Sequence, residues 1–243
     1  MTIISHTHEF IFLKTRKTAG SAIELWLADY LVPGRDLIAT AKELRKVKPH
    51  LAAQLSAEVD GWRGRLCALI GHPLKLSQHM PARRVRYVLG SRVWQRYRKI
   101  TIVRNPWDRI ISLWRWRQRR TDPPVSLEEF IAAIETGSMK EMRACSAAHW
   151  DNWPIYSIED QVVADDVIYY EDLSAGLSKV FGGLGITFTE LPHAKTGIRR
   201  VEDTVDILTP SQRDRIAELF KKEIETFGYA MPETGNAIRP PQC

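Results

Sequence analysis

The sequence predicts an α/β protein in which a parallel β-sheet is flanked by helices on both faces. Short apolar runs of a few residues alternate along the chain with longer segments of helical periodicity, as in proteins with parallel sheets. Apolar residues make up 44% of the chain and charged residues 26%, which is a composition that can bury a large core. No linker rich in proline, glycine or serine divides the 243 residues, so we expect a single domain over residues 1–243.

Four of the apolar runs are predicted to be buried strands, at residues 10–13, 67–70, 99–103 and 167–170. Helices are expected at residues 22–31, 81–89, 91–97, 106–116, 126–137, 175–184 and 209–228, with an interrupted helical pattern over 36–61. The helix at 126 opens with a capping box, Ser126 with Glu129. The last helix has the same motif in Thr209 and Gln212, followed by Gly228 as a stop signal.

Two loops that connect a predicted strand to the next helix, here called strand exits, have an unusual composition. The first strand exit follows residues 10–13. In a parallel sheet, ligands bind where the chain leaves a strand for a helix. Partial positive charge at a helix start, cationic side chains and hydroxyl groups together suit a multiply charged oxyanion, and Gly20 permits close backbone approach. The segment is not a Walker A loop, because its lysines precede the glycine. Its residues are Lys14, Thr15, Arg16, Lys17, Thr18, Ala19, Gly20, Ser21 and Ala22.

The second exit follows the predicted strand at 99–103. Arg104 ends this strand, and Ser112 lies two turns into the next helix. A guanidinium group and a hydroxyl group near one another hold a phosphate by directional hydrogen bonds. Two anion sites at two strand exits therefore predict a ligand with phosphates at both ends.

These residues carry a resemblance to a known family. The loop 14–21 resembles the 5′-phosphosulfate loop of sulfotransferases that use 3′-phosphoadenosine 5′-phosphosulfate (PAPS), and residues 103–112 resemble their 3′-phosphate motif. The run 167–173, which ends in Tyr-Glu-Asp-Leu, and the segments 191–195 and 227–229 are similar as well. The resemblance, strongest to bacterial and carbohydrate sulfotransferases, implies a P-loop-like α/β fold and transfer of a sulfuryl group from PAPS to a hydroxyl or an amine. Residues 35–65 match least, and we expect the variable acceptor-side segment there.

The resemblance also implies roles for the first loop. Lys17 would lie against the transferring sulfate and its bridging oxygen, and residues 18–22 would supply backbone and hydroxyl contacts. The chain departs from the family pattern at two positions. Many members have threonine where Ser21 stands and proline where Arg16 stands, so the role of Arg16 is left open.

The resemblance assigns the other end of the nucleotide to two further groups of residues. Arg104 and Ser112 would hold the 3′-phosphate. A basic segment would close over the nucleotide, and it comprises Lys195, Arg199 and Arg200.

The acceptor must lose a proton, and three side chains are candidates for the general base. His79 is the first choice, because its segment 77–80 resembles the one that supplies a histidine base in related sulfotransferases, and its ordinary pKa near ~6.5 suits neutral pH. His72 follows Gly71 at a predicted strand end, as in some relatives. Glu24, on the helix after the first loop, resembles in placement a glutamate that other sulfotransferases use.

The net charge of +6 favours an anionic partner without identifying it. A small-molecule, carbohydrate or lipid acceptor is expected, and no nucleic-acid partner. Three alternatives stay open: a P-loop-type nucleotide kinase, a nucleic-acid-binding protein that uses the Trp-Arg stretch at 114–120, and a nucleotide-binding relative without activity. Within that stretch, Trp114 is expected to pack in the core.

The remaining sequence features bear on whether the protein binds a metal ion and on where in the cell it is located. His6, His8 and Glu9 lie close in sequence, but they lack a partner cluster, so no metal site is expected. The three cysteines are far apart and the N-terminus lacks the pattern of a secretory signal, which favours a cytoplasmic protein. No apolar stretch approaches the ~20 residues of a membrane span, and the sequence predicts no oligomeric state.

Overall fold

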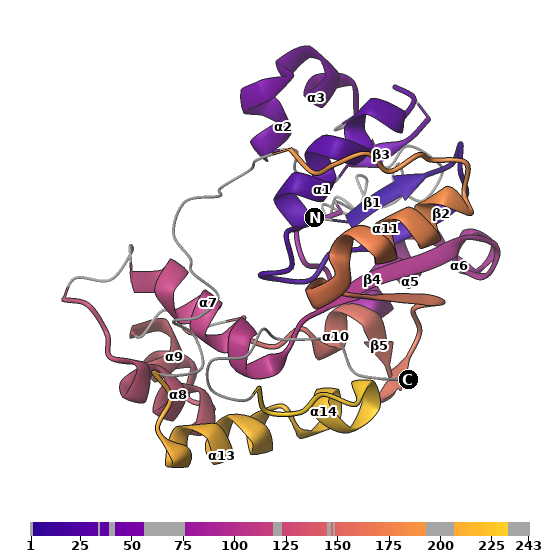
Figure 1. Ribbon diagram of the computed structural model, residues 1–243. Helices are drawn as coiled ribbons and strands as arrows, with labels where there is room; N and C mark the ends of the chain where they lie inside the picture. Colours follow the sequence, from indigo (N-terminus) through magenta and orange to yellow (C-terminus); the bar gives the residue numbers. More distant parts are fainter. Residues whose placement is uncertain are drawn as a thin grey trace, which may run out of the picture.

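The computed structural model describes residues 2–33, 35–38, 42–55, 76–118, 123–144, 147, 149–192 and 207–232. Its centre is a five-stranded sheet with the strand order β3-β1-β2-β4-β7 (Figure 1). These strands are β1 (Thr2–Ser5), β2 (Phe10–Leu13), β3 (Leu37–Ile38), β4 (Arg98–Val103) and β7 (Asp166–Tyr169). A separate two-stranded sheet pairs β5 (Ser157–Ile158) with β6 (Gln161–Val162).

The sheet is mixed, whereas the sequence predicted a parallel one. The predicted parallel pairing holds for β2 with β4 and for β4 with β7. Strand β1 runs antiparallel to both of its neighbours, β2 and β3. A four-residue turn, 6–9, joins β1 to β2 as a hairpin, and so short a connection permits only antiparallel pairing. The strand β1 was missed because only Ile3 and Ile4 form its apolar run.

The helices agree with most of the predicted ranges. They are α1 (Gly20–Leu27), α2 (Lys42–Val47), α3 (Pro49–Leu55), α5 (Ala82–Leu89), α6 (Ser91–Arg96), α7 (Pro106–Gln118), α8 (Leu127–Glu135), α9 (Met139–Ala144), α10 (Trp153–Tyr156), α11 (Leu173–Gly182), α13 (Pro210–Leu219) and α14 (Lys221–Phe227), with the 3₁₀ turns η1 (Ala28–Tyr30) and η2 (Tyr170–Asp172). The predicted last helix is two helices, because Phe220 has a non-helical backbone (φ −110°, ψ 18°) between them. The predicted strand at 67–70 lies outside the described residues.

Both faces of the sheet are covered by apolar side chains from helices. Along β2, Phe10 and Phe12 point into one cluster, which includes residues of α1 and α11, while Ile11 and Leu13 point into a second one with α5, α6 and α10. This alternation follows from the two-residue period of a strand. The carboxyl ends of β2 and β4 are thereby held side by side in a fixed register, with Leu13 opposite Thr101.

A third apolar cluster lies beside the sheet and joins α7, α8 and α13. Figure 1 shows these helices together in the lower left of the view. The capping boxes that open α8 and α13 are both formed, as predicted. Within the described parts of the chain, no helix is both long and apolar enough to cross a bilayer.

Candidate functional site

The loop between β2 and α1, residues 14–19, is tied to the neighbouring strand. The Thr15 hydroxyl donates a hydrogen bond to the carbonyl oxygen of Ile102 on β4 at 2.5 Å, and it lies 2.8 Å from the Thr18 hydroxyl. Lys17 and Ala19 adopt positive φ angles of 66° and 56°, a region that side chains other than glycine enter rarely. The loop therefore holds a specific, strained shape at the start of α1.

A buried ion pair lies beneath this loop. The Lys14 ammonium group is 3.5 Å from the Glu24 carboxylate, and both side chains are almost fully buried. A Cβ atom on Gly20 would lie 2.3 Å from Cε of Lys14, so the absent side chain leaves room for this lysine. Burial raises the pKa of Glu24, and the charge of Lys14 opposes that rise. Glu24, one of the three predicted bases, is thus an ion-pair partner in the interior.

The predicted second anion site contacts the first one directly. At the end of β4, the Arg104 guanidinium donates through Nη1 to the Lys17 carbonyl oxygen at 2.6 Å, and this nitrogen is 3.4 Å from Oγ of Ser112. Its Nε donates to Asp108 at 2.5 Å, one turn along α7, and its Cζ lies 4.0 Å from the centre of the Tyr170 ring. The structure therefore unites Lys17, Arg104 and Ser112, which sequence motifs had placed at two separate exits.

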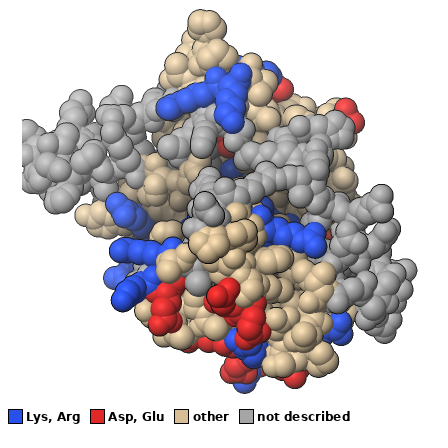
Figure 2. Space-filling model, turned by 90° about the vertical axis from the view of Figure 1, so that its left-hand side faces the viewer, with Lys and Arg blue, Asp and Glu red and all other residues tan. Residues whose placement is uncertain are grey.

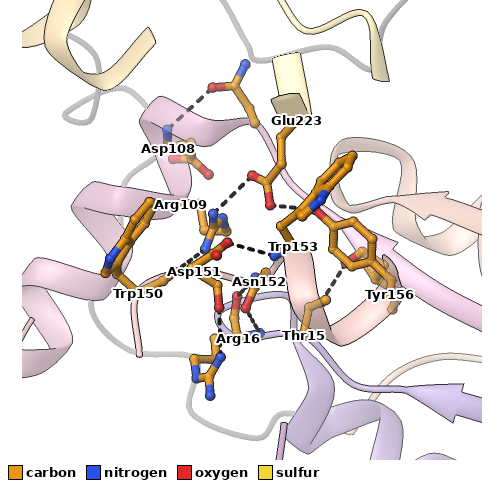
Figure 3. A network of polar contacts seen from close by, with 12 residues as sticks. Thr15, Arg16, Asp108, Arg109, Trp150, Asp151, Asn152, Trp153, Tyr156 and Glu223 are labelled. Carbon is orange, nitrogen blue, oxygen red and sulfur yellow. Dashed lines mark hydrogen bonds and ion pairs between the residues drawn. The ribbon is translucent and has the colours of Figure 1, made fainter. Parts of the chain in front are cut away.

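Asn152 also holds the β2–α1 loop, as Figure 3 shows. Its Oδ1 accepts a hydrogen bond from the Arg16 backbone N–H at 3.0 Å, and its Nδ2 donates to the Arg16 carbonyl oxygen at 3.1 Å. The Arg16 side chain in turn donates to the carbonyl oxygen of Asp151 at 3.1 Å. Asn152 is 2% exposed. The sequence analysis missed this residue, because no local motif marks it.

A buried network holds the segment that carries Asn152. The Arg109 guanidinium on α7 donates to the Trp150 carbonyl oxygen at 2.8 Å and to Glu223 of α14 at 3.0 Å (Figure 3). The Tyr156 hydroxyl donates to the other oxygen of Glu223 at 2.5 Å. Burial first, and then the Glu223 charge, raise the pKa of Tyr156 far above its ordinary value, so its hydroxyl keeps the proton that this bond requires.

Cationic side chains gather at the β2–α1 loop. Burial, and then repulsion by Arg109 and Arg117, lower the pKa of Arg16 to about 10. The Lys17 ammonium group lies 5.5 Å from the centre of the Trp116 ring, and the Arg117 guanidinium lies 4.6 Å from the same ring. Such mutual repulsion is relieved when an anion binds. Figure 2 shows Lys and Arg side chains on either side of the middle of this face, with most Asp and Glu side chains in its lower part.

His79 lies against the same loop. Its Nδ1 is 3.0 Å from the Lys14 carbonyl oxygen. A carbonyl oxygen only accepts hydrogen bonds, so Nδ1 carries the proton and Nε2 keeps its lone pair. Burial, with the charges of Arg16 and Lys14 among the further causes, lowers the pKa of His79 to about 2. The histidine is therefore neutral at physiological pH.

Several predicted residues lie outside the described part of the chain, namely His72, Lys195, Arg199 and Arg200. Trp114, expected in the core, is only partly buried: it packs against the α7–α8–α13 cluster, and its indole N–H donates to the Val125 carbonyl oxygen at 2.8 Å. Of the other loop residues, Ser21 is half-buried, and Ala22 is buried and bonds through its N–H to the Ala19 carbonyl oxygen at 2.9 Å.

The three N-terminal side chains considered for metal binding have separate partners. His6 Nδ1 lies 2.6 Å from the Tyr97 hydroxyl, and His8 Nδ1 lies 3.1 Å from the Leu184 carbonyl oxygen. Glu9 forms an ion pair with Arg96. Among the described residues, no group of three or more His, Cys, Asp or Glu side chains is arranged to hold a metal ion.

Comparison with known proteins identifies the family. The model of the sulfotransferase family matches residues 1–230 of the 243. No curated protein and no solved structure gives a significant match. The family match supports sulfuryl transfer in general and gives no support to the kinase and nucleic-acid alternatives. Because the matched region includes both strand exits and nearly the whole chain, the protein belongs to the sulfotransferase family.

Proposed function

We propose that this protein transfers the sulfuryl group of PAPS to a hydroxyl or an amine. In this proposal the 5′-phosphosulfate binds at residues 14–22, within a P-loop-like arrangement, and the 3′-phosphate binds at Arg104 and Ser112. The observation that carries the proposal is the 2.6 Å hydrogen bond from Arg104 to the Lys17 carbonyl oxygen. One nucleotide with phosphates at both ends requires two adjacent anion sites, and this bond supports their adjacency.

The donors around the loop fit such a ligand. Helix α1 begins with no side-chain cap and no acidic residue in its first turn, so its partial positive charge is directed toward the loop. Burial, and then repulsion by Arg109 and Arg117, lower the pKa of Arg16, and a bound polyanion would offset the part that comes from repulsion. PAPS brings the sulfuryl group already activated by its bond to phosphate, and the residues of the chain supply binding, orientation and proton transfer.

The reaction is an in-line displacement at sulfur. A bond forms between sulfur and the acceptor oxygen or nitrogen while the bond from sulfur to the leaving phosphate oxygen breaks. Lys17 stabilises the negative charge that grows on this leaving oxygen, and the strained loop fixes its position. The acceptor proton moves to Nε2 of His79, the ring nitrogen whose lone pair the bond to Lys14 leaves available.

Nucleotide binding strengthens this base. Burial is the largest cause of the low pKa of His79 in the free protein, and the positive charges of Arg16 and Lys14 are among the further causes. Phosphate and sulfate groups held beside these cations oppose their effect, so the pKa of His79 rises when the co-substrate binds. The protein thereby couples proton acceptance to the presence of the sulfuryl donor. In this proposal Trp116, whose ring centre lies 5.5 Å from the Lys17 ammonium group, contacts the acceptor, whether a small molecule, a carbohydrate or a lipid.

A transfer assay with sulfur-labelled PAPS tests the proposal. Wild-type protein is incubated with panels of carbohydrate, lipid and small-molecule acceptors, and label on the acceptor is measured. We expect transfer by the wild type, and a loss of about 100-fold or more in the His79→Ala variant with unchanged binding of 3′,5′-adenosine bisphosphate. Unchanged turnover in this variant would move the base to His72 or Glu24. Wild-type protein that neither transfers label nor binds the bisphosphate would overturn the proposal.

A further inference from the structure

We propose that Asn152 is a positioning residue that sets the backbone of the β2–α1 loop through its two hydrogen bonds to Arg16. The inference rests on the proposed function, in which this loop binds the 5′ end of PAPS. It also gives the departure at Arg16 a physical consequence. The Asn152 side chain supplies from outside the loop the restriction that a proline ring supplies within it.

The geometry of the Asn152 amide supports this role. Both of its hydrogen bonds go to one residue, from the Arg16 N–H at 3.0 Å and to the Arg16 carbonyl oxygen at 3.1 Å. These two atoms belong to successive peptide planes, so the amide fixes the orientation of both planes. Asn152 is 2% exposed, and burial makes each bond costly to leave unmade.

The turn that follows explains what these bonds control. Lys17, the next residue, has a φ of 66°, and the hydroxyls of Thr15 and Thr18 meet across the turn at 2.8 Å. Turns with a positive φ at the third residue commonly have proline at the second, because proline fixes φ near ~−65°. Proline has no N–H, so the bond from the backbone of residue 16 to Asn152 requires a residue other than proline at this position. The orientation of the peptide between residues 16 and 17 determines the direction in which the Lys17 side chain leaves the backbone.

The anchor of Asn152 is itself rigid. The Asp151 carboxylate accepts a hydrogen bond from the Trp153 N–H at 2.8 Å, and the Trp150 carbonyl oxygen accepts one from Arg109 at 2.8 Å (Figure 3). Arg109 lies on α7, the helix that also carries Ser112. Asn152 therefore connects the loop at the 5′ end of the nucleotide to the helix at its 3′ end.

Measuring the affinity for two different nucleotides distinguishes a role of Asn152 in positioning the loop from a general role in stabilising the fold. Titration calorimetry measures the affinity of full-length protein for 3′,5′-adenosine bisphosphate, which reaches both sites, and for adenosine 3′-monophosphate, which lacks the 5′ group. In Asn152→Ala we expect the affinity for the bisphosphate to fall about tenfold or more, and that for the monophosphate to change less than about twofold. Ser157→Ala is the matched control, because it removes one buried hydrogen bond to Trp153 in the same segment; both affinities should stay unchanged.

The outcomes are distinct. Equal weakening of both ligands in Asn152→Ala, or no weakening of either, would overturn the inference. Wild-type protein that binds neither ligand would overturn the proposed function before Asn152 is tested. Should Asn152→Ala not fold, Asn152→Ser is used instead: it keeps a small polar side chain, adds no charge, is too short to reach both backbone atoms of Arg16, and is expected to give the same selective loss.

A proline at position 16 tests whether a fixed backbone φ angle can replace the hydrogen bonds from Asn152. In the Asn152→Ala background, Arg16→Pro restores a fixed φ but removes the guanidinium, whereas Arg16→Gln removes only the guanidinium. We expect the double variant with proline to bind the bisphosphate several-fold more tightly than the one with glutamine, at about equal affinity for the monophosphate. Equal bisphosphate affinity in the two double variants would show that Asn152 does not replace a proline.

Discussion

Gly20 is the residue at which the loop, α1 and the interior meet. Its missing side chain makes room for Lys14, whose ammonium group pairs with Glu24 below the loop. The sequence analysis assigned this glycine to close ligand approach. The structure adds a second requirement for glycine. The space that a side chain at position 20 would need is already filled by the side chain of Lys14.

Substitution of this glycine gives the first prediction. In Gly20→Ala the new Cβ atom would lie 2.3 Å from Cε and 2.8 Å from Cγ of the buried Lys14, so the ion pair must shift. We expect a loss of about 1–3 kcal/mol in the free energy of unfolding, measured by urea denaturation. Gly182→Ala is the control, because nothing lies within 4 Å of its Cβ position. Equal stability of the two variants would contradict the crowding described here.

His79 gives a prediction on pH. Its pKa is about 2 in the folded protein and ~6.5 when unfolded, so between these values the unfolded chain binds more protons. Its contribution to stability is therefore complete above pH ~6.5 and is lost as the pH falls below it. Urea denaturation between pH 7.5 and 5.5 should show a shallower loss for His79→Gln than for the wild type, with a slope difference below about 1.4 kcal/mol per pH unit. Identical slopes would place the folded pKa of His79 near its ordinary value.

At the scale of elements, α14 has two unlike faces. Glu223 points inward and accepts hydrogen bonds from Arg109 and Tyr156. Its neighbour Lys222 points outward and forms an exposed ion pair with Asp160. Loss of one partner from a buried pair leaves an uncompensated charge, whereas loss of an exposed partner returns the other to water.

The two faces predict opposite outcomes for two adjacent substitutions. Glu223→Ala should lower the free energy of unfolding by about 3–5 kcal/mol, because the Arg109 charge remains buried. Lys222→Ala should leave it unchanged within error. Thermal or urea unfolding of both variants measures the difference. A mild effect of Glu223→Ala would mean that Arg109 finds water or another partner.

Local signals predicted the elements well and the sheet less well. The capping boxes of α8 and α13 and the turns after β2 and β4 depend on neighbouring residues, so they were visible in the sequence. Strand β1 has an apolar run of only Ile3 and Ile4, and the break at Phe220 coincides with burial of its ring in the α7–α8–α13 cluster, which no local signal in the sequence marks.

At the scale of the whole molecule, the site is made by contacts between distant segments. The bond between Asn152 and Arg16 joins residues 136 positions apart, and the bond from Arg104 to Lys17 spans 87. Motifs predicted the two ends of the second contact, because each has its own chemical signature. Asn152 has none, since a buried asparagine is recognisable only by the backbone atoms that surround it.

The parallel part of the sheet explains why the two exits meet. Strands β2 and β4 are neighbours in register, so the loops after Leu13 and Val103 leave from the same edge. The loop that precedes α1 is bonded to the end of β4 through Thr15 and Ile102 and through Lys17 and Arg104, so the cations of the two segments share one region. This arrangement makes the affinity for a nucleotide with phosphates at both ends the central claim.

Calorimetry with 3′,5′-adenosine bisphosphate tests that claim most directly. We predict micromolar binding by the intact protein and a loss of about tenfold to 100-fold in each of Lys17→Ala and Arg104→Ala, because each removes a charged donor from one end of the ligand. Lys222→Ala, a surface change away from the loop, serves as the control and should bind as the wild type does. Absence of binding by the wild type, or full binding by both site variants, would contradict the account.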